Sequence, residues 1–206
     1  MTAKLRGEAG QAFPIYVVMV AGLLFLAFAF FTVGKASALR NGAQGAADSA
    51  ALAAAQQSRE LFQAPFQASL PTNTLDVFLQ GHPVLGCPAA HAFAAENGAK
   101  VDPPVGGCVA SPGGERDEIS VKVKTLKPVG ASVVPGMKKT FANGHATAVI
   151  EWRCPKWKAV DYNDDGVQDM YFFSCRGGEV FSIAAAGPLD WPRLSKIFFD
   201  VHLVDS

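Results

Sequence analysis

The longest apolar stretch of the chain runs from Ala12 to Val33 and contains no charged side chain. A helix needs about 20 apolar residues to cross the roughly 30 Å hydrocarbon core of a bilayer. No other stretch of this sequence is both as long and as apolar. We therefore predict a transmembrane helix at residues 12–34, preceded by a short basic tip at residues 1–11.

The residues on either side of this stretch bear on its orientation and its processing. Lys4 and Arg6 precede it, and lysine and arginine are retained on the cytoplasmic side of a membrane. We expect a single-pass cell-membrane protein with a cytoplasmic N-terminus and an extracytoplasmic C-terminal domain. The alternative is a cleaved signal peptide, because Ala36-Ser37-Ala38 has the small-residue pattern of a cleavage site. Signal peptides have apolar cores of about 7–15 residues, so the length here favours a retained anchor.

An alanine-rich stem follows at residues 35–64, and its small residues recur at steps of three and four. The recurring positions are Ala43, Ala46, Ala47, Ala50, Ala51 and Ala54. This spacing predicts a helix from about Ala38 to Phe62, continuous with the membrane segment and ended by Pro65. Its small-residue face would let another helix approach closely; the alternative is a solvated alanine-rich helix.

Beyond Pro65 the pattern changes to short apolar clusters separated by proline and glycine. Alternating apolar and polar residues over Glu118–Leu126 predict a half-buried antiparallel strand. Further strands are expected at residues 141–152, 170–175, 180–183 and 197–204, short helices at 75–79 and 88–97, and a loop at 101–114. Before the last strand, Pro192 could equally begin a short helix. The fold class is therefore α+β, with the long helix followed by a small antiparallel β-rich domain at residues 65–206.

All four cysteines follow the membrane segment, which suits disulfides in an oxidising compartment. Cys87 and Cys108 lie 21 positions apart, and so do Cys154 and Cys175. We favour these two local pairs among the three connectivities. A zinc site lacks the usual C-x-x-C spacing, and unpaired buried thiols are the remaining alternative.

Charge and motifs exclude several function classes. The chain has 18 basic and 18 acidic residues, so it lacks the basic surplus expected of a nucleic-acid binder. It contains no G-x-S-x-G, no H-E-x-x-H and no phosphate-binding loop, so we name no catalytic residues, no cofactor and no small-molecule substrate.

Residues 161–169, with the sequence DYNDDGVQD, form the one candidate metal site. The side chains of Asp161, Asn163, Asp165 and Asp169, with the carbonyl of Val167, supply the oxygen ligands that calcium prefers. Phe172 stands where an EF-hand has its bidentate glutamate, so the loop is closer to the D-x-N-x-D-G-x-x-D type. The alternative is a metal-free hairpin, because Asp-Gly between apolar strands is a strong turn signal.

The residues RGEAGQ, the apolar segment and LRNGAQGAADSAALAAA together resemble the N-terminal region of TadE/TadG-like proteins of Tad/Flp pilus assembly. The matching positions are Asn41, Ala43, Ala46, Ala47, Asp48, Ala50, Ala51, Leu52 and Ala53, within about residues 6–56. The resemblance implies a bacterial pilin-like or pilus-associated envelope protein with pilin-like or envelope partners. Prepilin processing expects Glu at the fifth position after a Gly, where this chain has Ala12 or Ile15.

Three functional hypotheses follow from these patterns. The first is a non-enzymatic, membrane-anchored envelope protein in pilus assembly, which binds other proteins through its helix. The second is a secreted or anchored binding module with a calcium-stabilised hairpin and no pilus role. The third, which the residues favour least, is an exported enzyme.

Overall fold

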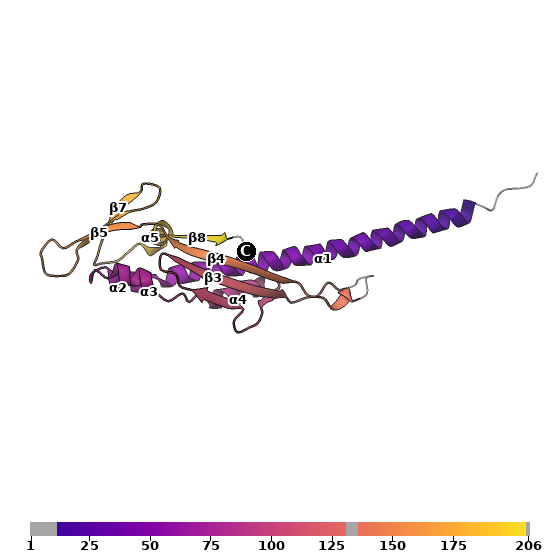
Figure 1. Ribbon diagram of the computed structural model, residues 1–206, viewed down its shortest axis with the longest axis horizontal. Helices are drawn as coiled ribbons and strands as arrows, with labels where there is room; N and C mark the ends of the chain where they lie inside the picture. The colour runs from indigo at the N-terminus through magenta and orange to yellow at the C-terminus, as the bar shows by residue number, and fades with distance from the viewer. Residues whose placement is uncertain (1–11, 131–135, 205–206) are drawn as a thin grey trace, which may run out of the picture.

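A single long helix and a two-sheet domain at its C-terminal end make up the computed structural model, which describes residues 12–130 and 136–204 (Figure 1). The helix α1 (Ala12–Leu61) has 50 residues. Its second half lies inside the domain, whereas its first half projects from it as a rod (Figure 1). The expected continuity of the membrane segment with the stem is confirmed. The predicted tip at residues 1–11 lies outside the described residues.

Three short helices follow α1. They are α2 (Gln63–Ser69), α3 (Leu75–Gly81) and α4 (Cys87–Glu96). Pro65 has no N–H to donate to the carbonyl of Leu61, and α1 ends at Leu61. The chain nevertheless returns to helix after Phe62, so Pro65 lies within α2 rather than ending all helical structure.

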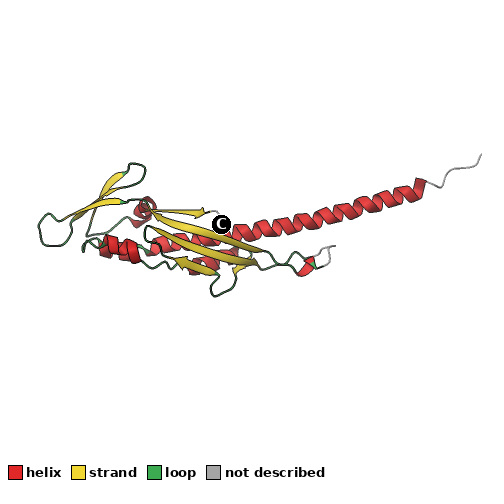
Figure 2. Ribbon diagram, in the orientation of Figure 1, coloured by secondary structure: helices red, strands yellow, loops and turns green. Residues whose placement is uncertain are grey.

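The larger sheet is antiparallel and lies along α1 (Figure 2). Its strands are β1 (Ala99–Val101), β2 (Cys108–Ser111), β3 (Arg116–Thr125), β4 (Asn143–Trp152) and β8 (Phe199–Val204). Both β1 and β2 pair with β3 on one side, while β4 pairs with β3 on the other side and then with β8. The alternation predicted for β3 is confirmed, because Ile119, Val121 and Val123 are buried.

The loop prediction for residues 101–114 was wrong in part, because β2 and the last residue of β1 lie within it. These strands have only three and four residues, too few to show a period of two. They form because β3, with ten residues, offers hydrogen-bonding partners along its whole length. The connection from β3 to β4 includes the one-turn 3₁₀ helix η1 (Met137–Lys139).

The smaller sheet has the order β5-β6-β7 and lies beside the C-terminal helix. Its elements are β5 (Lys156–Val160), β6 (Met170–Ser174), β7 (Val180–Ala184) and the neighbouring α5 (Trp191–Phe198). The strand expected at residues 197–204 begins only at Phe199, because α5 occupies the preceding residues. The α+β fold class is confirmed.

Phe198 joins the two sheets through aromatic contacts. Its ring stacks on Trp152 of β4 at 5.1 Å between centroids and meets Phe173 of β6 edge-on at 4.8 Å. It also contacts Phe66 of α2 at 5.0 Å. All four rings are buried, so one aromatic cluster holds strands of both sheets and α2 together.

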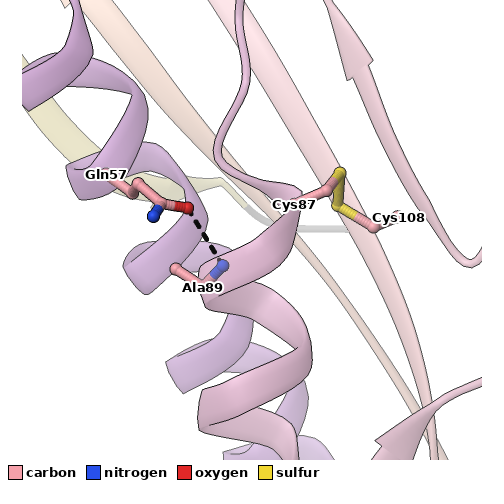
Figure 3. The surroundings of a disulfide bond; sticks show 4 residues. All are labelled: Gln57, Cys87, Ala89 and Cys108. Carbon is pink, nitrogen blue, oxygen red and sulfur yellow. Dashed lines mark hydrogen bonds between the residues drawn. A yellow bond between two sulfur atoms is a disulfide. The ribbon is translucent and has the colours of Figure 1, made fainter.

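Each disulfide connects two cysteines that lie 21 positions apart in the chain. Cys87 at the start of α4 pairs with Cys108 at the start of β2, and Cys154 pairs with Cys175 across the base of the β5–β6 hairpin. Figure 3 shows that α4 is also bound to α1, because the backbone N–H of Ala89 donates to Oε1 of Gln57 at 3.0 Å.

The contact between α1 and its neighbours is close because small residues meet on both sides. The alanines of α1 from Ala43 to Ala55 are at most 6% exposed, and they pack on β3, β4 and α4. A Cβ atom added to Gly144 of β4 would collide with the carbonyl group of Ala43. One added to Gly86, just before α4, would collide with the carbonyl group of Ala54.

We therefore expect Gly144→Ala to lower the free energy of unfolding by about 1–3 kcal/mol, because the added methyl group forces α1 away from the sheet. Gly42→Ala is the matched control, since nothing lies within 4 Å of that position and alanine favours the helix. Urea unfolding of the detergent-solubilised chain, followed by tryptophan fluorescence, measures both. Equal stabilities of the two variants would contradict the close packing described here.

Candidate functional site

The projecting half of α1 is covered with large apolar side chains that contact little else in the described part of the chain. From Phe13 to Val33 the large apolar residues are between 36% and 74% exposed. By length and composition, this is the one helix among the described residues that is suited to cross a membrane. A bare apolar surface of this size requires lipid or another apolar partner.

The alanine face, defined as the buried alanines of α1 from Ala43 to Ala55, has a different environment. The domain of the same chain covers it, with the sheet and α4 packed against it. The close approach expected of this face therefore takes place within the chain. A separate helix can reach only the opposite side of this part of α1 and the projecting half.

Polar side chains fix the position of α1 on the sheet. Nε2 of Gln44 donates to the carbonyl oxygen of His145 in β4 at 2.9 Å and to Oδ1 of Asp48 at 2.8 Å. Nδ2 of Asn97, just after α4, donates to Oγ of Ser49 at 3.0 Å. Asp48, one of the positions that carry the family resemblance, thus orients the glutamine that binds the helix to the sheet.

The candidate calcium loop joins β5 and β6 and lies at the tip of the hairpin. Both carboxylate oxygens of Asp161 accept backbone N–H groups, from Asp164 and Gly166 at 2.8 Å each and from Asn163 at 3.2 Å. Burial acts in the opposite direction, but these hydrogen bonds dominate and lower the pKa of Asp161 below its usual value. The N–H of Val167 donates to Asp165 at 2.8 Å.

Asp169 closes the loop by accepting the N–H of Tyr162 at 2.8 Å. Each predicted carboxylate ligand therefore satisfies a backbone amide of its own loop. In residues 12–130 and 136–204, no group of three or more His, Cys, Asp or Glu side chains has the spacing to hold a metal ion. The geometry is sufficient for a hairpin turn, and calcium binding by this loop stays a prediction.

A buried His–Asp pair that no sequence motif indicates lies between the end of α3 and β3. Nε2 of His82 lies 2.6 Å from Oδ2 of Asp117, and both side chains are only 2% exposed. Nδ1 of His82 faces the carbonyl oxygen of Phe78 at 2.8 Å, and the N–H of Gly113 donates to Oδ1 of Asp117 at 3.0 Å. The residues are 35 positions apart, so no local motif reveals the pair.

The surroundings of His82 favour its charged form. Burial opposes the imidazolium, but the hydrogen bond and charge of Asp117, together with the Phe78 carbonyl, outweigh it and raise the pKa of His82. A carbonyl oxygen can only accept, so Nδ1 must carry a proton. The pair is largely buried, with the ring centre of Phe62 4.3 Å from that of the imidazole, so it binds the end of α3 to the sheet.

Residues 10–57 match the family described as putative Flp pilus-assembly TadE/G-like. The N-terminal region of this chain is therefore similar to that family. The match confirms the resemblance found in the sequence and spans both the projecting half of α1 and its alanine face. No curated protein matches the chain, and no solved structure matches it. Most of the chain, from residue 58 onward, thus lies outside the matched region.

Stability should depend on pH through His82. The pKa of His82 is raised in the folded state. Its contribution to the free energy of unfolding is therefore complete below the unfolded pKa of about 6.5, and it is lost as the pH rises through the pKa of the folded state. We expect the free energy of unfolding to fall above pH 6.5 in the wild type. At pH 6, His82→Gln should cost about 3–5 kcal/mol, because it leaves Asp117 buried without its charged partner.

Urea unfolding at several pH values measures this effect, with the exposed His91→Gln as control. The control should retain the wild-type pH dependence. A His82→Gln variant with the same pH dependence as the wild type would refute the assignment.

Proposed function

We propose that this chain is a single-pass envelope protein that acts in Flp-type pilus assembly, with its C-terminal domain on the extracytoplasmic side. The observation that carries the proposal is the division of α1 within the TadE/G-like match. One half is bare and apolar, and the other half is the core of a folded domain. If the protein is anchored in a membrane, the apolar half of α1 can lie in the lipid while the other half holds the folded domain outside it.

The orientation rests on the cysteines and on the N-terminal charges. Disulfides persist in oxidising compartments, and both bonds of this chain lie in the C-terminal domain. Lys4 and Arg6 favour a cytoplasmic N-terminus, but Lys35 and Arg40 on the other flank weaken this charge bias, so the cysteines carry more of the weight. Both features support an extracytoplasmic domain.

We propose that the protein acts through contacts rather than through catalysis. The matched family is one of pilus assembly. The projecting half of α1 offers a contact surface within the membrane for the helices of pilin-like partners. Nothing lies within 4 Å of a Cβ atom added to Gly22, so a partner helix has room to approach α1 there.

A second candidate is an anchored or secreted binding module whose β5–β6 hairpin is stabilised by calcium. Gly166 has a φ of 86°, the left-handed conformation in which glycine is favoured. The turn around it directs the carboxylates of Asp161 and Asp165 toward the interior of the loop, and the same oxygens are suited to a hard cation. This candidate needs no pilus partner.

The first proposal predicts that Leu24→Arg, in the middle of the apolar segment, removes the chain from the membrane and abolishes surface pili. An arginine at a helix centre costs about 2.5–3.5 kcal/mol of insertion free energy. Leu61→Arg is the matched control, because Leu61 is 49% exposed at the other end of α1. Carbonate extraction and electron microscopy of the producing cells measure membrane retention and pili.

Two results would refute this proposal. The first is normal piliation after deletion of the gene. The second is a mature N-terminus at Leu39, because cleavage after Ala38 would remove the whole membrane segment.

The calcium candidate predicts a rise in melting temperature of about 3–6 °C at a calcium concentration ten times the dissociation constant. Asp161→Asn combined with Asp165→Asn should abolish the rise. Asp164→Asn is the control, since Asp164 has a φ of 60° that asparagine also tolerates and is not a predicted ligand. An unchanged melting temperature of the wild type in millimolar calcium would eliminate this candidate.

A further inference from the structure

The connection between β3 and β4 lies against α1 at the end of the apolar segment. Figure 1 shows that its described residues extend from the sheet on the side of the projecting half of α1. Val129 and Phe141 of the connection and Thr32 and Arg40 of α1 line the same groove. Thr32 is only 4% exposed, although the large apolar residues around it are bare. The connection therefore reaches the last turn of the predicted membrane segment.

This part of the molecule lies within reach of a membrane surface. If Gly34 marks that surface, Arg40 lies about 9 Å beyond it along the helix, at about 1.5 Å for each residue. Charges in solution interact over about 8–10 Å at physiological ionic strength. The groove between α1 and the connection therefore lies within the range of headgroup charges.

Basic residues occur in or near the segments that line this groove, and acidic residues are missing from the same segments. We define the basic face as Lys35, Arg40, Lys124, Lys127, Lys138 and Lys139. No Asp or Glu occurs from Ala9 to Ala47 or from Ile119 to Ile150. Within the described part of the chain, none of these six side chains forms an ion pair. The local charge is thus strongly positive although the whole chain is neutral.

Aromatic rings accompany these cations. Nζ of Lys35 lies 5.3 Å from the ring centre of Phe31, one turn back toward the membrane segment, and Nζ of Lys124 lies 5.5 Å from that of Phe141. Phe141 is 40% exposed. Long basic side chains beside exposed apolar rings are typical of surfaces that rest in the headgroup region of a bilayer.

We propose that the basic face binds the anionic phospholipid headgroups of the leaflet from which α1 emerges. The proposal rests on the proposed function, because it requires α1 to span the bilayer. Each lysine or arginine close to an anionic membrane strengthens its attraction, and six of them act together here. The contact holds the domain against the membrane at the β3–β4 connection, while the smaller sheet at the opposite end points away (Figure 1).

The full chain, reconstituted in nanodiscs, tests this proposal by hydrogen–deuterium exchange of residues 126–130 and 136–142. Two lipid compositions are compared, phosphatidylcholine alone and phosphatidylcholine with about 30% phosphatidylglycerol, a fraction that gives an anionic surface. We expect exchange at these amides to be slower in the anionic nanodiscs by about fivefold or more, and this difference to vanish in about 0.5 M salt.

Combined Lys127→Gln, Lys138→Gln and Lys139→Gln should remove the difference between the two lipids. The matched control combines Lys156→Gln, Lys158→Gln and Lys196→Gln, in β5 and α5. It removes the same charge elsewhere, and the difference in exchange rate between the two lipids should remain. The salt dependence of the wild type tests the proposal without any variant, should the triple substitution prevent folding.

The outcomes separate this inference from the function on which it rests. A chain that enters neither type of nanodisc refutes the membrane anchor, and the inference with it. A chain that enters both, with equal exchange rates, overturns the lipid contact alone. Slow exchange in both lipids that survives the lysine substitutions also overturns it, because the connection is then held by α1 or by a second copy of the chain.

Discussion

The close approach of α1 to the sheet is the contact on which the rest of the structure depends. Alanine buries little area for each residue, but it lets two backbones meet at a distance that larger side chains forbid. Gly144 and Gly86 allow this approach from the other side. Once α1 is seated, β3, β4 and α4 have a common surface to pack on, and the alanines belong to the same core as the distant aromatic cluster.

A consequence of this packing is that one unbroken helix passes between two very different environments. The backbone of α1 is the same throughout, but its projecting half is apolar and bare whereas its other half is enclosed. Since α1 has no break between Gly34 and Ala43, the helix itself sets the direction of the domain relative to the segment suited to a membrane. The helix stays continuous at this junction although Gly34 and Gly42 lie there.

Some polar groups of the molecule have partners within the chain, whereas the basic face does not form ion pairs in the described residues. His82 and Asp117 are buried and fully hydrogen-bonded, and the carboxylates of the β5–β6 loop bind its own amides. The basic face has no such partners in the described residues. Surplus charge of one sign at one end of a neutral molecule favours an external anionic partner, because internal pairing is not available to it.

The sequence by itself determined the elements whose pattern is local. The charge-free run, the alanine spacing and the alternation from Ile119 to Val123 predicted α1 and β3, because helix and strand periods are read from neighbouring residues. The tertiary structure alone decided what the alanine face packs against, where β1 and β2 form, and that His82 meets Asp117. It also brought Val129 and Phe141 of the β3–β4 connection beside α1. Each of these depends on segments far apart in the chain, and no local period encodes which distant surface a segment will meet.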